Sequence, residues 1–199
     1  MLRRTLLLCL SLVAMTLTAG APSLVVPVAE LPTPAPPAIA STGDSAPPAP
    51  VSVADPAPIR LLIPRIAVDA SIEALGLDQN RALAIPADAK DVAWFDQGPK
   101  PGQPGNALIN GHVSWWTGSA VFARLAELRP GDRVLVVRGD GTRASFKVTG
   151  LRSLPAGARD ISLFAASQTA TVTLITCSGW WNAGLGSYTQ RLLVSATLE

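Results

Sequence analysis

Residues 133–151 read RVLVVRGDGTRASFKVTGL, and this stretch decides the class of fold. Two apolar runs, Val134–Val137 and Phe146–Val148, flank the turn signal Gly139-Asp140-Gly141. β-Branched and aromatic residues on both sides of a glycine-rich turn are typical of an antiparallel hairpin. The stretch therefore predicts two paired β-strands.

Similar short runs recur on both sides of this hairpin, and turn signals such as Pro104-Gly105 and Pro130-Gly131 separate them. The predicted strands are Arg60–Ile63, Val68–Leu75, Val92–Phe95, Ala107–Asn110, Arg133–Arg138, Ser145–Leu151, Thr171–Cys177 and Arg191–Leu198. Only Ala120–Leu128 has apolar residues at helical spacing with a Pro-Gly stop behind it. About eight strands with one or two short helices predict an all-β barrel or sandwich.

The composition excludes several classes of protein. The 199 residues include 16 Lys+Arg and 14 Asp+Glu, a net charge of +2 that argues against a nucleic-acid binder. The chain holds two Cys and one His, too few for a zinc site built from Cys and His alone or for a disulfide scaffold. We expect no metal and no cofactor.

The N-terminal part predicts export. Arg3 and Arg4 precede the apolar run Leu6–Leu17, and Ala19-Gly20-Ala21 has the pattern of a signal-peptidase site. Residues 1–21 are therefore predicted to be a signal peptide or, if retained, an N-terminal membrane anchor. Residues 22–58 hold 11 of the 18 prolines and predict an extended, disordered linker. The folded domain is predicted over residues 59–199, exported and either anchored or secreted.

Two rare reactive side chains lie at the ends of predicted strands. Cys177 ends the run that begins at Thr171, and His112 follows the apolar run Ala107–Gly111. An imidazole near a thiol can stabilise the thiolate and protonate a leaving group. Arg191 begins the last predicted strand after a long loop, Ser178–Gln190, and near such a pair its guanidinium could hold a developing oxyanion. The alternatives are a buried structural Cys, a hydrogen-bonding His and a surface Arg.

Two tryptophan pairs follow these residues, Trp115-Trp116 after the His and Trp180-Trp181 after the Cys. In a strand, one Trp of each pair would face the core. The other would line a groove for an apolar peptide or would simply pack.

The run Thr173-Leu174-Ile175-Thr176-Cys177 resembles the TLxTC signature of the sortase family. Gly111-His112 after an apolar strand resembles the family's catalytic His motif, and Arg191 matches its essential Arg. Stretches such as Ala93-Trp94-Phe95 are similar to the class E and F sortases of actinobacteria. The resemblance covers about Ile59 to Glu199.

The resemblance implies an eight-stranded β-barrel that cleaves an LPxTG-type sorting signal between Thr and Gly. Cys177 would form a thioester with the Thr carbonyl, and His112 would protonate the leaving amine and deprotonate the incoming one. Arg191 would bind substrate and the oxyanion, and Thr176 would contact substrate. The partners implied are proteins with LPxTG-type signals and a peptidoglycan-precursor amine, with water resolving the thioester, as in a thiol peptidase, when no amine is present.

Two departures from the family refine this expectation. Many relatives carry Asp two residues after the His, where this chain has Ser114, so no carboxylate is expected there to orient the imidazole. Asp55-Pro56-Ala57 lacks the aromatic ring of the pilin-type lid, which favours general protein anchoring over pilus polymerisation. Two alternatives stay open: another exported cysteine peptidase or transpeptidase, and a non-catalytic wall-associated β-domain.

Overall fold

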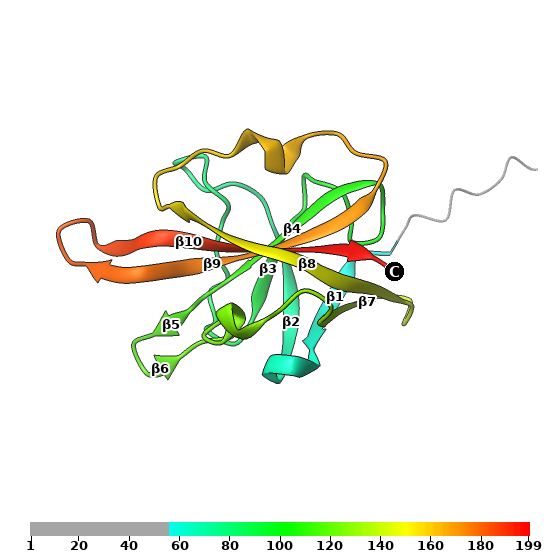
Figure 1. Cartoon of the computed structure of the whole chain (residues 1–199), viewed down its shortest axis with the longest axis horizontal. Helices are drawn as coiled ribbons and strands as arrows, with labels where there is room; N and C mark the ends of the chain where they lie inside the picture. The colour runs from blue at the N-terminus through cyan, green and yellow to red at the C-terminus, as the bar shows by residue number, and fades with distance from the viewer. Residues whose placement is uncertain (1–55) are drawn as a thin grey trace, which may run out of the picture. The chain divides into compact units, whose positions relative to one another are not determined.

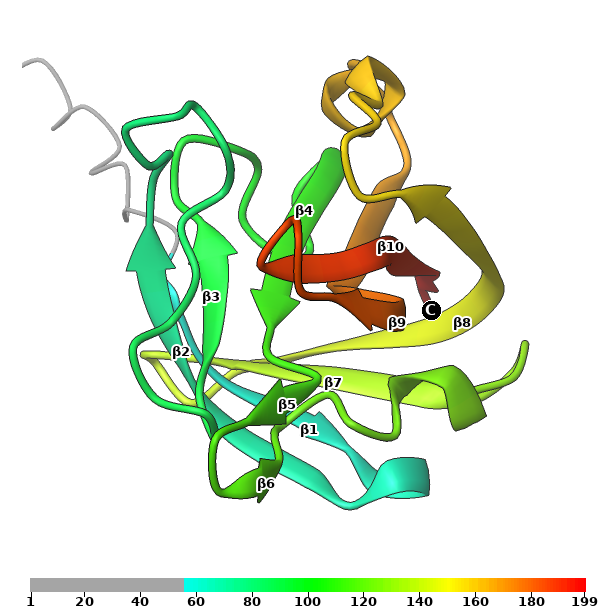
Figure 2. The ribbon, with the colours of Figure 1, turned by 90° about the vertical axis from the view of Figure 1, so that its left-hand side faces the viewer.

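The structure is a computed structural model that describes residues 56–199. Eight strands close into a barrel in the order β1-β2-β3-β4-β9-β10-β8-β7 (Figures 1 and 2). The predicted eight-stranded all-β barrel is confirmed. The predicted export segment, residues 1–21, and residues 22–55 of the predicted linker lie outside the described residues.

The barrel strands correspond one by one to the eight predicted runs. They are β1 (Pro58–Ile63), β2 (Val68–Leu75), β3 (Val92–Phe95), β4 (Gly105–Gly111), β7 (Arg133–Arg138), β8 (Arg143–Pro155), β9 (Ala170–Asn182) and β10 (Ser187–Leu198). A separate two-stranded ribbon, β5 (Ser114–Trp115) and β6 (Gly118–Ser119), follows β4. Three 3-10 helices complete the described chain: η1 (Pro64–Ile66), η2 (Leu125–Glu127) and η3 (Ile161–Phe164).

The core fills the inside of the barrel, because alternate residues of each strand point inward. On β4 the inward residues Ala107 and Ile109 are fully buried, and on β9 the same holds for Val172 and Leu174. The residues between them face outward. This alternation puts the polar side chains of β4 and β9 together on the outer face of the sheet.

The hairpin of β9 and β10 is longer than predicted and corrects the expected loop Ser178–Gln190. β9 continues to Asn182 and β10 begins at Ser187, so only residues 183–186 connect the two strands. Figure 1 shows this hairpin projecting from the barrel on the same side as the β5–β6 ribbon. Cys177 and Arg191 therefore lie inside a β-ladder and not at its ends.

The segment Ala120–Leu128 forms successive turns and the single 3-10 helix η2, not the predicted longer helix. Its backbone bonds span three residues and not four, as Leu125 N donates to Phe122 O and Leu128 N to Leu125 O, while Phe122 N donates to His112 O outside the segment. Phe122 and Leu125 are fully buried. A segment this short gains little from helix formation, and these tertiary contacts decide its conformation.

Candidate active site

Three neighbouring strands position the residues singled out in the sequence. β4 and β9 run parallel, and their pairing ends with Asn110 and Ile175. Cys177 lies two residues further along β9, and His112 directly follows Gly111, the last residue of β4. On the other side of β9, Arg191 of β10 pairs directly with Cys177. Since adjacent strands lie about 4.8 Å apart, the register places the three residues side by side in the fold.

All three side chains line one cleft of about 600 Å³ on the outer face of the barrel. The cleft lies between the loop that joins β2 to β3 and the hairpin of β9 and β10, and its further lining includes Ile85, Tyr188 and Trp181. Cys177 is a free, half-buried thiol. A half-exposed thiol in a cleft is open to a substrate, whereas a thiol inside the barrel would be inert.

The imidazole of His112 is fixed from two directions. Its Nε2 lies 2.9 Å from the backbone oxygen of Pro86, in the β2–β3 loop. The indole of Trp115 packs against it edge to face, with ring centroids 4.7 Å apart. Among residues 56–199, a backbone carbonyl and an indole, and no carboxylate, orient the ring.

The guanidinium of Arg191 is held by uncharged acceptors on its own strand. Nη1 donates to the backbone oxygens of Gln190 at 3.0 Å and Tyr188 at 3.3 Å, and Nη2 donates to Ser187 Oγ at 3.3 Å. Within residues 56–199 no carboxylate pairs with it. Its positive charge is therefore available to an anion or a polarised carbonyl in the cleft.

Thr176 also lines the cleft, but its hydroxyl is buried and donates to the backbone oxygen of Gly111 at 2.8 Å. This bond ties β9 to β4 at the residue that precedes His112. Thr176 thus sets the spacing of the two strands that carry the thiol and the imidazole.

The tryptophan pairs do not place one ring each in the core. Trp116, Trp180 and Trp181 are all largely exposed, and Trp115 is half-buried against His112. Both hairpins project beyond the barrel and have no interior to fill. Trp181 stacks edge to face on Tyr188, with centroids 5.5 Å apart, at the wall of the cleft.

Sequence reasoning missed three contributors to the site: Pro86, Asn110 and Tyr188. Asn110 donates through Nδ2 to the backbone oxygen of Ala84, and Tyr188 shares a 2.7 Å hydrogen bond with Ser114 that links the two hairpins. The polar Asn110 at the end of the predicted run Ala107–Asn110 was the available signal. In the described part of the chain, no group of three or more His, Cys, Asp or Glu could hold a metal ion.

The fold and the cleft together define a β-barrel protein with a cysteine, a histidine and an arginine along one cleft. A family model described as the sortase domain matches residues 61–199. The chain therefore belongs to the sortase family, the cysteine transpeptidases that act at the cell surface on proteins with sorting signals.

Solved sortase structures share the fold. The lid mutant of sortase A from Corynebacterium diphtheriae matches with 20% identity and a TM-score of 0.57, over 72% of this chain and 70% of that chain. Sortase C-1 from Actinomyces oris matches with 25% identity and a TM-score of 0.56, over 73% and 76%. The Group B Streptococcus Pilus Island 1 sortase C2 matches with 20% identity and a TM-score of 0.56, over 71% and 73%. No curated protein matches the sequence.

Proposed function

We propose that this sortase cleaves an LPxTG-type sorting signal between Thr and Gly and transfers the protein to a cell-wall amine. The observation that carries the proposal is that His112, directly after β4, Cys177 of β9 and Arg191 of β10 line one cleft. A placing in class E or F, expected from the motifs, stays a prediction.

In the proposed reaction, the thiolate of Cys177 attacks the Thr carbonyl, and the carbonyl oxygen becomes an oxyanion. The guanidinium of Arg191 stabilises that charge, because its position is already fixed by its strand. The C–N bond then breaks, and His112 gives its proton to the departing glycyl amine. A thioester to Cys177 remains.

The second half of the reaction reverses these roles. An amine from peptidoglycan precursor attacks the thioester, His112 takes its proton, and the Cys177 thiolate leaves. Water resolves the thioester when no amine is present, which is the thiol-peptidase side reaction. Thr176 contributes as a cleft-lining residue that contacts substrate and fixes β9 to β4.

The proposal includes the rest of the chain. Residues 1–21 direct export and, if retained, anchor the protein in the membrane. Residues 22–58 act as an extended spacer, except that its last residue, Pro58, already belongs to β1 and pairs with Arg138. Residues 59–199 form the catalytic domain. In the described residues, no helix has the length and apolarity to cross a bilayer. The mass of the mature N-terminus tests whether residues 1–21 are removed.

Turnover of a quenched fluorescent LPxTG peptide by the full chain tests the catalytic proposal. We expect Cys177→Ala to abolish cleavage and the wild-type chain to accumulate a thioester adduct detectable by mass. Retained cleavage in Cys177→Ala would reject the mechanism. A thiol-reactive probe separates the alternatives, because a non-catalytic β-domain would show no faster alkylation of Cys177 than an unfolded chain at neutral pH.

A further inference from the structure

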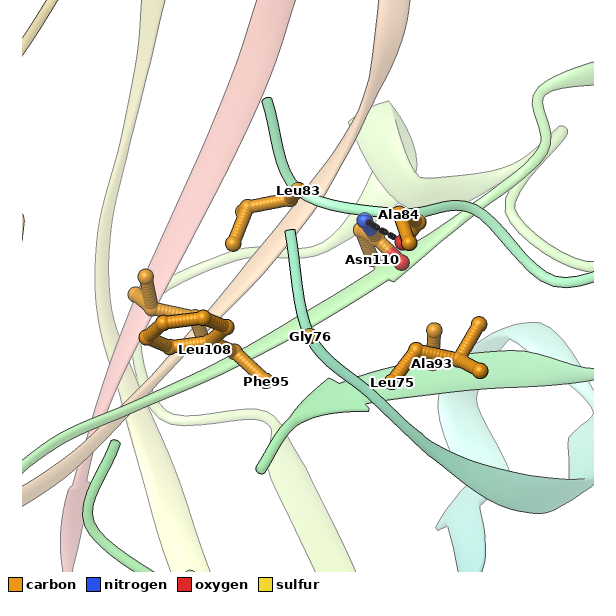
Figure 3. Close-up of a pocket in the computed structure, with 8 residues that line it drawn as sticks. All are labelled: Leu75, Gly76, Leu83, Ala84, Ala93, Phe95, Leu108 and Asn110. Atoms are coloured by element: carbon orange, nitrogen blue, oxygen red, sulfur yellow. Dashed lines mark hydrogen bonds between the residues drawn. The ribbon is translucent and has the colours of Figure 1, made fainter. Parts of the chain in front are cut away.

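The loop between β2 and β3 is bound by two hydrogen bonds to the end of β4. Asn110 of β4 and His112, which directly follows β4, lie two residues apart, as do Ala84 and Pro86 in the loop. Asn110 Nδ2 donates to Ala84 O at 2.9 Å, and His112 Nε2 lies 2.9 Å from Pro86 O. Figure 3 shows Asn110 beneath the loop, with its amide turned to Ala84.

Asn110 is buried between the loop and the cleft. It is 92% buried, being 8% exposed, and its Oδ1 has no hydrogen-bond partner within residues 56–199. It lines the cleft and also the small space between Leu108 and the loop (Figure 3). A buried polar side chain is stabilised by the hydrogen bonds that it makes, and the bond from Nδ2 to Ala84 is the one that fixes this amide.

The second bond determines the protonation pattern of the imidazole. A backbone carbonyl can only accept a hydrogen bond, so Nε2 of His112 must carry the proton that points to Pro86 O. When the ring is neutral, Nδ1 is then the nitrogen with the free lone pair. Pro86 is buried, and its carbonyl sits at the end of the segment that Asn110 binds.

We propose that Asn110 is a positioning residue of the transpeptidation reaction: by binding Ala84 it holds the Pro86 carbonyl on Nε2 of His112. The imidazole is thereby confined to one tautomer, and Nδ1 becomes the nitrogen that exchanges a proton with Cys177 and the amines. This role rests on the function proposed above. In this arrangement the backbone carbonyl of Pro86 orients the imidazole, a role for which Ser114 supplies no carboxylate.

Nitrogen NMR of the full chain labelled with ¹⁵N-histidine tests the tautomer directly. The chain contains one histidine, so the spectrum reports His112 alone. In the neutral ring we expect a single tautomer protonated on Nε2. Asn110→Leu removes the donor and keeps the volume, and we expect it to give a mixture of both tautomers. Its kcat should fall about 10- to 100-fold, as when an outer partner of a functional histidine is lost, while its KM stays nearly constant.

Asn106→Leu is the matched control. Asn106 lies on the same outer face of β4 and binds the backbone oxygen of Leu163, in another loop, at 3.0 Å. We expect this variant to keep the single tautomer and most of kcat, even if it is less stable. A further variant replaces Ala87 by the corresponding hydroxy acid, which makes the Pro86 carbonyl a weaker acceptor without changing any side chain. We expect it to shift the tautomer as Asn110→Leu does.

Several results would overturn the proposal. A wild-type ring protonated on Nδ1 would do so, and so would an Asn110→Leu chain with an unchanged tautomer and unchanged kcat. Equal losses of kcat in the Asn110 and Asn106 variants, without a tautomer change, would reduce Asn110 to a structural role. The tautomer is measured without substrate, so the two proposals can fail independently. If the proposed function is wrong, the chain shows no turnover of the sorting peptide although His112 has the expected tautomer.

Discussion

The guanidinium of Arg191 is positioned by hydrogen bonds to residues of its own strand. Two backbone oxygens and Ser187 Oγ accept from Nη1 and Nη2. Lysine has one compact ammonium group and cannot bind these acceptors and a substrate oxygen in the same planar geometry. We therefore expect Arg191→Lys to lower the turnover of an LPxTG peptide by about 100-fold, the loss typical of a missing oxyanion donor.

Steady-state kinetics on the full chain check this expectation, and Arg191→Ala should lose at least as much activity. Arg152→Lys is the control, because Arg152 pairs with Asp160 on the surface. Full activity in Arg191→Lys would show that a positive charge alone suffices for turnover and that the planar donor geometry of the guanidinium has no role.

At Gly111 the backbone of β4 packs closely against the side chains of Val121 and Phe122. A Cβ atom there would lie 2.9 Å from Val121 Cγ1 and 2.9 Å from Phe122 Cδ2. Phe122 is fully buried and cannot move away freely. We expect Gly111→Ala to destabilise the fold by about 1–3 kcal/mol, as overpacking does, and to lower turnover by displacing His112. Denaturant unfolding measures the first effect, and unchanged stability would contradict the crowding argument.

The sequence allowed His112, Cys177 and Arg191 to be predicted because each is a rare or charged residue beside an apolar run. Cys–His chemistry suggested their grouping and the resemblance to the sortase motifs supported it, whereas spacing along the chain did not, since His112 and Cys177 are 65 positions apart. Pro86 could not be predicted. Its contribution is a backbone oxygen, which every residue type carries, and it comes from a loop 26 residues away.

The hairpin of β9 and β10 is the element that forms one wall of the cleft. Gly179 makes its bulge: the register between the strands shifts between Tyr188 and Gln190, and Gly179 has a φ of 78°. A Cβ atom there would lie 2.5 Å from Thr189 Oγ1. The bulge turns the outer part of the hairpin, so that Trp181 and Tyr188 line the cleft.

We expect Gly179→Ala to raise the KM for a sorting peptide. We expect its effect on the free energy of unfolding to be the smaller of the two when both are expressed as free energies. The positive φ costs about 1–2 kcal/mol for an L residue, and relief of that strain would straighten the bulge and move the cleft wall. Peptide kinetics and thermal unfolding measure the two effects. Gly141→Ala is the control, with a φ of 83° in the distant turn between β7 and β8. An unchanged KM in Gly179→Ala would mean that the bulge does not shape the cleft.

The same hairpin shows why element boundaries could be predicted in the barrel and not outside it. Inside the barrel, alternate residues are buried, and the pattern of Thr171–Cys177 is readable. Beyond Cys177 both faces are exposed, so the alternation stops although the strand goes on to Asn182. The β5–β6 ribbon was missed for the same reason, because strands of two residues carry no periodicity.

At the scale of the whole molecule, Glu199 links three strands of the closed barrel. It follows β10, and its carboxylate accepts from Ser145 Oγ of β8 at 2.6 Å. The same carboxylate pairs with Lys147 of β8 at 3.2 Å and with Arg133 of β7 at 3.3 Å. The hydrogen bond from Ser145, followed by that from Lys147, holds the pKa of Glu199 below its ordinary value.

This shift predicts how the stability of the barrel depends on pH. A carboxyl group whose pKa is lower in the folded chain stabilises that chain fully above the unfolded pKa, about 4.3 for Glu. The contribution is lost as the pH falls through the lower folded pKa, because the proton then binds both states. The glutamine side chain of the Glu199→Gln variant carries no charge at any pH. We therefore expect the variant to be less stable than the wild type near neutral pH and to approach it in acid.

Denaturant unfolding of both chains at roughly pH 7 and pH 3 measures this difference. Glu73→Gln is the control, since the side chain of Glu73 makes no hydrogen bond or ion pair within residues 56–199. Added salt should shrink the neutral-pH gap only in part: it screens the exposed Arg133 and Lys147 pairs, while the bond from Ser145 persists. A gap between wild type and Glu199→Gln that stays constant from neutral to acid pH would show that the carboxylate does not stabilise the closed barrel through its charge.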